Sequence, residues 1–253
     1  MRPSLVNGLA FIVAVSIVSA ACSSADGHNN KTAPATTGTT PAAAGGVATT
    51  AAGGAAVTDS LAKAADASRI LGSPSAKLWV IEVSDFQCPY CKQWHDDAYP
   101  VLINDYVKTG KVRLAYVNFP LPMHRNARAA ATAAMCAGAQ GKFWQMHDAL
   151  FASQAKWEGE KTPATTFDSL ANSIGVNPTA YHACLTSPSI AALIAGDQDR
   201  AQRGGVGSTP SFWVGSRMIE GAVPASEMRA AVDQALAAAL DSASAGTSAN
   251  KSK

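Results

Sequence analysis

Charged side chains are scarce in this sequence. Asp, Glu, Lys and Arg make up only 15% of its 253 residues, and the formal net charge is +2. A protein that binds the nucleic-acid backbone needs a concentrated positive field, which this balance does not supply. We therefore expect no nucleic-acid partner. Hydrophobic residues, at 47%, are numerous enough to build a buried core.

The apolar run near the N-terminus is too short to cross a membrane. It covers residues 9–18, whereas a membrane-spanning helix needs about 20 apolar residues. Arg2 precedes this run and Ser19-Ala20-Ala21-Cys22 follows it, which is the order of a secretory signal and its cleavage site. We therefore expect residues 1–21 to be a signal peptide that is removed on export.

Cys22 stands directly after small residues and before Ser23-Ser24, an arrangement that resembles the lipobox of bacterial lipoproteins. Ser19 departs from that family, which has an aliphatic residue there. The resemblance implies that Cys22 is acylated and anchors the protein to a membrane; ordinary signal-peptidase cleavage nearby is the alternative. An acylated Cys22 leaves four of the five cysteines, an even number, for disulfides in an oxidising compartment.

Large apolar side chains are almost absent from residues 23–57, which are mainly Ala, Gly, Thr, Ser and Pro. Such a stretch cannot bury enough surface to offset its ordering entropy. We therefore predict a flexible tether over residues 22–57, followed by a short helix at 61–70. The small, polar residues 241–253 are predicted to form a disordered tail.

The central part of the chain alternates strand and helix patterns. Residues 77–83 are almost continuously apolar, as in a strand covered on both faces, and residues 111–118 alternate apolar and polar. A helix over residues 89–107, interrupted near Pro100, joins these strands into a βαβ unit. Further helices are predicted at residues 127–139, 141–153, 167–174, 178–187, 189–203 and 225–240, and two short strands at 211–220.

Cys88 and Cys91 stand between the first strand and the helix that follows it. Helix geometry puts positions i and i+3 on one face, close enough for a disulfide. The free amides and dipole of the helix N-terminus favour an anion, so we predict a lowered thiolate pKa for Cys88 and not for Cys91. This asymmetry fits a redox couple in which Cys88 is the nucleophile and Cys91 the resolving thiol.

These cysteines have two alternative uses. Cys88, Cys91 and His95 lie at positions i, i+3 and i+7 and could bind zinc, but a structural zinc site usually has a second close cysteine pair. A purely structural disulfide across so short a loop would remove little entropy from the unfolded chain. We therefore favour the redox couple, and we predict neither a metal ion nor an organic cofactor.

Two further features accompany the dithiol. Glu82 lies in the apolar strand, where a carboxyl group needs a specific reason, and a role as proton carrier for Cys91 supplies one. A strand-edge Glu82 that reaches solvent is the alternative. Thr209-Pro210 opens a strand after a glycine-rich loop, and the sequence leaves open whether its peptide bond is cis or trans.

The segments EVSDFQCPYCKQW, NFPLPMHRNARAAATAAMCAGAQGKFWQMHDALF and GGVGSTPSFWVGSRMIEGAVP, in this order, resemble bacterial thioredoxin-fold proteins of the DsbA type over roughly residues 66–240. The resemblance implies an α/β thioredoxin fold, formed by residues 58–122 and 206–240, with an inserted α-helical domain at 123–205. It also implies these site residues: Cys88 as nucleophile, Cys91 as resolving thiol, Glu82 as buried acid and Thr209-Pro210 as a cis-proline loop. Tyr90 is a departure, because the strongly oxidising members have His at that position.

Cys136 and Cys184 both fall in the predicted insertion. Their disulfide would close a loop of about 48 residues and contribute roughly 4 kcal/mol to stability. Two buried free thiols, or a second redox relay, are the alternatives. We favour a structural disulfide.

The sequence as a whole indicates an exported thiol-disulfide oxidoreductase of the periplasm or cell envelope, which introduces disulfides into unfolded exported proteins. The residues expected to line a groove for these substrates are Phe86, Pro89, Tyr90 and Trp94. We expect a membrane oxidant to restore the Cys88–Cys91 disulfide. The alternatives are an isomerase or reductase with the same dithiol, or the metal-binding module. Isomerases of this family resemble dimers built on an extra N-terminal domain, which residues 23–57 cannot supply, so we expect an oxidase and a monomer.

Overall fold

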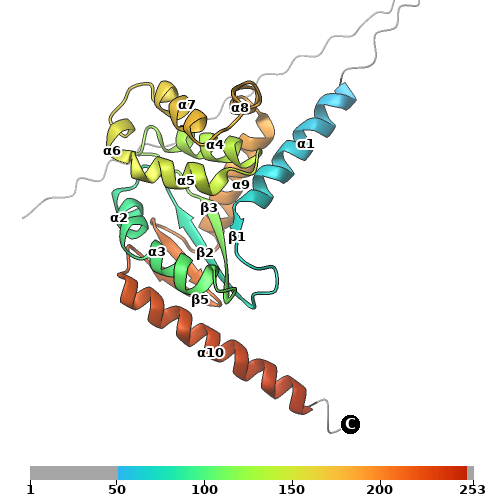
Figure 1. Cartoon of the computed structure of the whole chain (residues 1–253), viewed down its shortest axis with the longest axis vertical. Helices are drawn as coiled ribbons and strands as arrows, with labels where there is room; N and C mark the ends of the chain where they lie inside the picture. The colour runs from blue at the N-terminus through green and yellow to red at the C-terminus, as the bar shows by residue number, and fades with distance from the viewer. Residues whose placement is uncertain (1–50, 250–253) are drawn as a thin grey trace, which may run out of the picture. The chain divides into compact units, whose positions relative to one another are not determined.

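The computed structural model describes residues 51–249, with side chains for residues 60–241 (Figure 1). The predicted signal peptide, Cys22, residues 22–50 of the predicted tether and residues 250–253 of the predicted tail lie outside the described residues. Within residues 51–249, no helix is both long and apolar enough to span a bilayer.

A five-stranded sheet organises the described chain. Its strands are β1 (Ile70–Leu71), β2 (Leu78–Ser84), β3 (Val112–Asn118), β4 (Ser211–Val214) and β5 (Arg217–Glu220), in the spatial order β1-β3-β2-β4-β5. β2 and β3 run parallel, and the other neighbouring pairs run antiparallel. The predicted βαβ unit is therefore confirmed. The two-residue strand β1 is too short to show a periodicity in the sequence.

The helices lie close to the predicted segments. They are α1 (Ala51–Ser68), α2 (Pro89–Asp97), α3 (Tyr99–Leu102), the π-helix η1 (Ile103–Val107), α4 (Ala127–Gly138), α5 (Phe143–Ala152), α6 (Gln154–Trp157), α7 (Ala164–Ser173), α8 (Pro178–Leu185), α9 (Pro188–Arg203) and α10 (Ala225–Ala249). The predicted interruption near Pro100 is confirmed, because α2 ends at Asp97 and Pro100 lies in the first turn of α3. Proline fits a first turn because the N–H that it lacks would have no intrahelical partner there.

Two helix ends contradict the predicted tether and tail. α1 begins at Ala51, inside the predicted tether, and α10 continues to Ala249, through most of the predicted disordered tail. Both extensions are rich in alanine, the residue with the highest helix propensity. The prediction of disorder rested on the lack of large apolar side chains, and that lack does not prevent a helix from forming.

α2, α3 and α10 lie on one side of the sheet (Figure 1). Together with η1 they contribute apolar side chains to a core that they share with β2, β3 and β4. Side chains alternate between the two faces along a strand. Leu78 and Val80 point into this core, so Glu82, two residues further along β2, points to the same face. The buried carboxyl group therefore lies on the side of the sheet that the CxxC helix covers.

α4 to α9 lie between β3 and β4 and form a helical insertion, whose core is continuous with Phe86, Cys88, Cys91 and Tyr116. Cys136 in α4 and Cys184 in α8 form a disulfide with their Cα atoms 5.6 Å apart, which confirms the predicted pairing. α1 packs against α4 and α9. The fold is thus the predicted α/β thioredoxin fold with inserted helices, while the predicted domain limits at residues 123 and 205 stay a prediction.

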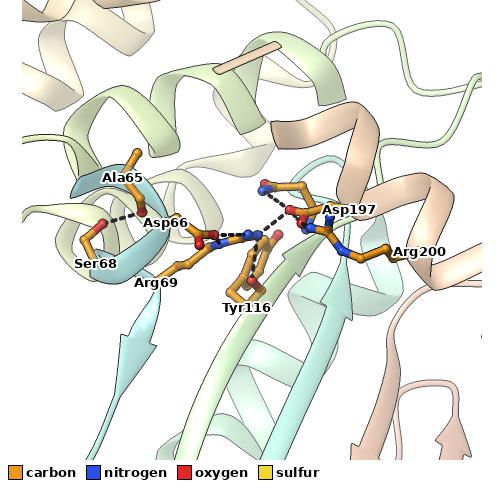
Figure 2. Close-up of polar contacts among 8 residues, drawn as sticks. Ala65, Asp66, Ser68, Arg69, Tyr116, Asp197 and Arg200 are labelled. Carbon is orange, nitrogen blue, oxygen red and sulfur yellow. Dashed lines mark hydrogen bonds and ion pairs between the residues drawn. The ribbon is translucent and has the colours of Figure 1, made fainter. Parts of the chain in front are cut away.

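A buried ionic network joins the end of α1 to β3 and α9 (Figure 2). Fully buried Asp197 accepts hydrogen bonds from three side chains: Arg69, Arg200 and Asn118. Arg69 also donates to the Tyr116 carbonyl oxygen at 3.2 Å. Each buried charge has an opposite charge beside it, which offsets much of its desolvation. The network therefore anchors β3, which pairs with β2, the strand that leads to Cys88.

Candidate active site

The dithiol lies where β2 passes into α2. Cys88 is the N-cap residue, with an extended backbone (φ −69°, ψ 125°), and Pro89 is the first helical residue. The Lys92 N–H donates to the Cys88 carbonyl oxygen at 3.1 Å and closes the first turn. Cys91 therefore lies one turn inside the helix, as its spacing from Cys88 predicts.

Both cysteines are free thiols in this structure, and their surroundings differ. The Cys88 sulfur donates to the Thr209 carbonyl oxygen at 3.4 Å. The Cys91 sulfur is fully buried and accepts from the Asp85 N–H at 3.5 Å. The Thr209-Pro210 peptide bond is cis, so the proline loop implied by the family resemblance lies against the predicted nucleophile.

The two thiols have opposite acidities. A hydrogen bond from the Cys91 thiol is the largest influence that lowers the pKa of Cys88, to about 6, and the N–H groups of Tyr90 and Cys91 add to it. Burial, followed by the neighbouring Cys88, raises the pKa of Cys91 well above its usual value. The predicted asymmetry is present, but its main source is the partner thiol rather than the helix N-terminus.

We expect the reduced protein to show one thiolate that titrates near pH 6. Replacement of Cys91 by serine should keep most of this shift, because a serine hydroxyl can still donate to the Cys88 sulfur. Replacement of Cys91 by alanine should move the Cys88 pKa upward, because its strongest stabilising hydrogen bond is lost. Ultraviolet thiolate absorbance across pH measures both values, and equal pKa values in the two variants would contradict this assignment.

Glu82 is fully buried, so the alternative in which it reaches solvent is wrong. Neither of its carboxyl oxygens has a hydrogen-bond partner among the described residues. Burial raises the pKa of Glu82 to about 8, and the negative charge of Asp148 adds to this effect. A buried carboxyl that changes its protonation near neutral pH can carry protons for a neighbouring thiol.

Glu82→Gln should stabilise the protein more at alkaline than at acidic pH. The folded-state pKa of about 8 lies above the ordinary value of 4.5, so the folded state retains a proton that the unfolded chain has lost. Stability due to this group therefore falls as pH rises from about 4.5 to about 8. Relative to its effect at about pH 4, the substitution should raise the unfolding free energy by about 4 kcal/mol at about pH 7.5.

Denaturant unfolding at these two pH values measures the effect of Glu82→Gln. Glu220 is exposed in β5, and Glu220→Gln is the matched control because it removes the same charge without burial. A gain of the same size at both pH values, or in the control, would show that Glu82 titrates normally.

A pocket of about 310 Å³ opens beside Cys88. It is lined by Cys88, Pro89, Tyr90, Leu121, Met123, His124, Gly207, Ser208 and Thr209. Tyr90 is 62% exposed and Met123 is 75% exposed, so two large apolar side chains stand at the pocket in contact with water. Exposed apolar side chains of this size beside a pocket are typical of a binding surface.

The prediction that Phe86 and Trp94 line the substrate groove is wrong. Both side chains are 1% exposed. The Phe86 ring stacks on Tyr116 with centroids 5.0 Å apart, and the Trp94 ring packs on Phe212 at 4.6 Å. Trp94 follows Cys91 by three residues and so shares its buried side of α2. The two residues form the core behind the dithiol, and of the predicted groove residues only Pro89 and Tyr90 line the pocket.

The loop between β3 and α4 supplies pocket residues that sequence reasoning missed. The buried carboxylate of Asp85 holds this loop: it accepts from the Leu121 N–H at 2.8 Å and pairs with His124 Nδ1 at 2.7 Å. It also accepts from the Gln87 N–H at 2.8 Å. Asp85 and His124 belong to the segments that carry the family resemblance, but their contact leaves no signal in the spacing.

The residues just before Cys88 are bonded to the helical insertion. Gln154 Nε2 donates to the Phe86 carbonyl oxygen at 2.7 Å and to the Cys88 carbonyl oxygen at 3.1 Å. Gln87 Nε2 donates to the Glu158 carbonyl oxygen at 2.9 Å. The turn before Cys88 is therefore positioned by residues of the insertion.

His95 does not join the two thiols. Among the described residues, no group of three or more metal-binding side chains includes Cys88 or Cys91. His95 Nε2 instead lies 3.4 Å from an oxygen of Asp148 in α5. This placement argues against the alternative metal-binding module.

Comparison with known proteins places the chain in a family. A family model described as Thioredoxin matches residues 64–234, more than half of the chain. A Na(+)/H(+) antiporter NhaA 1 of Salinispora arenicola is 35% identical over 173 residues, which are 68% of this chain and 25% of that protein. The chain thus spans about a quarter of the length of that relative.

Two further comparisons concern proteins nearer in length. Disulfide bond formation protein D of Bacillus subtilis is 26% identical over 171 residues, covering 66% of this chain and 76% of that protein. The crystal structure of Wolbachia pipientis alpha-DsbA1 has the same fold, with a TM-score of 0.63 at 21% identity over 69% of this chain and 93% of that one. The chain therefore belongs to the thioredoxin family, and its fold and dithiol group it with the DsbA-type proteins.

Proposed function

We propose that this protein is an extracytoplasmic thiol-disulfide oxidoreductase that introduces disulfides into exported proteins by exchange at Cys88 and Cys91. The observation that carries the proposal is the asymmetry of the dithiol. Cys88 borders a pocket and has a lowered pKa, whereas Cys91 is fully buried with a raised pKa. A nucleophile and a resolving thiol need this difference.

The proposed exchange begins with the oxidised pair. A substrate thiolate in the pocket attacks the Cys88 sulfur, the Cys88–Cys91 bond breaks, and Cys91 leaves as a thiolate that takes up a proton. A second substrate thiolate then attacks the substrate sulfur of the mixed disulfide and displaces Cys88. The substrate leaves with a disulfide, and both enzyme cysteines are reduced. Thr209 and its carbonyl oxygen, 3.4 Å from the Cys88 sulfur, lie where the substrate backbone would pair.

Reoxidation needs a partner that carries a disulfide, which we propose to be a membrane protein. The Cys88 thiolate attacks that disulfide, and Cys91 then attacks Cys88 and releases the partner as a dithiol. No organic cofactor enters this scheme. The signal-like N-terminus supports export to the periplasm or cell envelope, and the lipobox-like Cys22 supports a lipid anchor.

The lowered pKa of Cys88 favours oxidation of substrates over their reduction. A stabilised thiolate favours the reduced enzyme, so the enzyme disulfide becomes a better oxidant. A Cys88 pKa of about 6 lies between those of thioredoxin, about 7, and DsbA, about 3.5. Tyr90, where strong oxidants have His, is consistent with this intermediate acidity.

The reduction potential of the Cys88–Cys91 couple tests the direction of exchange. We expect a value between the about −270 mV of thioredoxin and the about −120 mV of DsbA. Equilibration with glutathione buffers of known ratio, followed by alkylation and mass measurement, gives this value. A potential at or below that of thioredoxin would make the protein a reductase and contradict the proposed oxidase.

A further inference from the structure

Glu82 has a raised pKa of about 8 and, because it is fully buried, no direct contact with water. Cys91 gains a proton when the couple is reduced and loses it on oxidation, so a proton must enter and leave the buried site. Tyr116 is the cross-strand partner of Glu82 in β3, and its hydroxyl is buried and also unpartnered among the described residues. Burial, then the charges of Glu82 and Cys91, raise the pKa of Tyr116. These three side chains therefore share one buried region.

His147 of α5 reaches this region from the insertion. Its ring lies edge-on to the Tyr116 ring, with centroids 5.4 Å apart, and to the Phe86 ring at 5.8 Å. His147 is fully buried, and its Nε2 has no hydrogen-bond partner in the described part of the chain. Its Nδ1 lies 2.8 Å from Oδ1 of Asp148. One ring nitrogen is thus free in the interior while the other contacts a carboxylate.

Asp148 connects this histidine to water. Its side chain is 53% exposed, and it also contacts His95 of α2 at 3.4 Å. Although burial opposes the shift, hydrogen bonds from His147 and His95 lower the pKa of Asp148, so it is a carboxylate near neutral pH. Its negative charge contributes to the raised pKa of Glu82.

We propose that His147 and Asp148 form a proton relay between Glu82 and solvent, an inference that rests on the proposed exchange at Cys88 and Cys91. His147 Nε2 exchanges a proton with the Glu82 carboxyl group, and Nδ1 exchanges one with water at Asp148. Neither the Glu82 carboxyl group nor His147 Nε2 has a hydrogen-bond partner among the described residues, and Tyr116 is a neighbour of both residues. A neutral imidazole suits the task because each nitrogen can donate or accept in turn.

In the reductive half-reaction, the substrate thiolate forms a bond to Cys88 and the electron pair of the broken disulfide stays on Cys91. Glu82 gives its proton to the Cys91 thiolate and becomes a carboxylate. His147 restores this proton from Nε2, while Nδ1 takes one from water at Asp148. One proton enters the site, and the imidazole is neutral before and after the transfer.

When the disulfide of the partner reoxidises the couple, a proton passes through the relay in the opposite direction, from Glu82 to water. Glu82 gives its proton to Nε2 of His147, while Nδ1 releases one to water at Asp148. The Glu82 carboxylate then accepts the proton of Cys91, which attacks Cys88 and displaces the partner thiolate. One proton leaves, so each turnover restores the starting protonation states.

The structure, with free thiols, matches the state after proton uptake. With its proton on Nδ1, His147 donates to the Asp148 carboxylate, which leaves Nε2 as an acceptor. Burial lowers the pKa of His147 to about 4, so the ring stays neutral near pH 7 and relays by changing its tautomer.

Three other titratable groups face the His147 ring. His95 of α2 lies with its ring 5.3 Å away, Tyr99 of α3 at 5.2 Å and Tyr116 of β3 at 5.4 Å. Burial raises the pKa of both tyrosines, so neither competes as an anion. His95 bonds to the same Asp148 oxygen and belongs to the outer end of the relay.

The test is the rate at which dithiothreitol reduces the oxidised full-length protein, followed by stopped flow across pH in H₂O and D₂O. We expect His147→Phe and Asp148→Asn each to slow the step about tenfold near pH 7 and to change its solvent isotope effect. The reduction potential should stay the same, because a relay alters the rate of proton transfer and not its end states. Asp148 is half-exposed, so Asp148→Asn carries the test if His147→Phe does not fold.

His182→Phe is the matched control, because His182 pairs with Asp168 at 3.7 Å in another part of the insertion. In a Glu82→Gln background, His147→Phe should add no further slowing, because the relay acts through Glu82. Unchanged rates in folded Asp148→Asn, additive slowing with Glu82→Gln, or a shifted reduction potential that accounts for the slowing would overturn the relay. A wild-type protein that does not exchange with dithiothreitol at all would overturn the proposed function instead.

Discussion

Cys88→Ser should abolish thiol-disulfide exchange. The Cys88 sulfur borders the pocket and has a lowered pKa, whereas Cys91 is fully buried with a raised one. A serine hydroxyl cannot form the mixed disulfide, and the buried thiol cannot replace the nucleophile. We expect oxidation of a reduced, unfolded substrate protein to slow by about a thousandfold or more, to the uncatalysed rate. The appearance of substrate disulfides over time, measured by alkylation, gives this rate.

Cys91→Ser is the matched comparison, because it removes the other sulfur from the same helix. We expect Cys88 to remain reactive and to form mixed disulfides that persist, because no thiol is left beside it to resolve them. Non-reducing mass measurement detects these adducts. If adducts accumulated on Cys91 in the Cys88→Ser variant instead, the two roles would have to be exchanged.

Removal of the Cys136–Cys184 disulfide should lower the free energy of unfolding by about 4 kcal/mol. The bond closes a loop with a sequence separation of 48, and it restricts the unfolded chain accordingly. Denaturant unfolding of the Cys136→Ala/Cys184→Ala variant at constant pH measures the loss. The bond joins α4 and α8 within the insertion, so the folded variant should keep its exchange rate with dithiothreitol.

Two further measurements separate this effect from simple loss of packing. Cys136→Ser/Cys184→Ser keeps the volume closer to that of the thiols, and its stability should fall by a similar amount. A loss below about 1 kcal/mol in both variants would show that the bond does little to restrict the unfolded chain. A loss in the alanine variant alone would assign the effect to a cavity.

The elements with a strong local pattern could be predicted from the sequence, and those that depend on context could not. The apolar run before Cys88 and the alternating run at residues 111–118 gave β2 and β3 to within a residue or two. β1 consists of only two residues and pairs with β3 through tertiary contact, so no periodicity reveals it. The helical ends at Ala51 and Ala249 could not be predicted from hydrophobicity, because alanine favours a helix even where large apolar side chains are lacking.

The reacting residues of the site could be predicted from the sequence, but the residues that line its pocket could not. The spacing of Cys88 and Cys91 and the apolar context of Glu82 are local signals, and the structure has each where it was expected. Phe86 lies in the loop before Cys88 and Trp94 lies in α2, and both side chains turn into the core. The sequence around the two cysteines does not specify this direction. His147 has no ligand spacing in the sequence, and its ring contacts with Phe86 and Tyr116 depend on tertiary packing.

The hydrogen bonds made by Gln154 and Gln87 limit how far this protein can be shortened. The backbone carbonyls of Phe86 and Cys88 are held by a side chain of the insertion, and Gln87 is tied to Glu158 in the same segment. A minimal domain made by excising the insertion would retain the CxxC motif but lose the partners that shape the turn before it. The insertion is therefore not an optional accessory, and the redox behaviour of this dithiol cannot be transplanted with the motif alone.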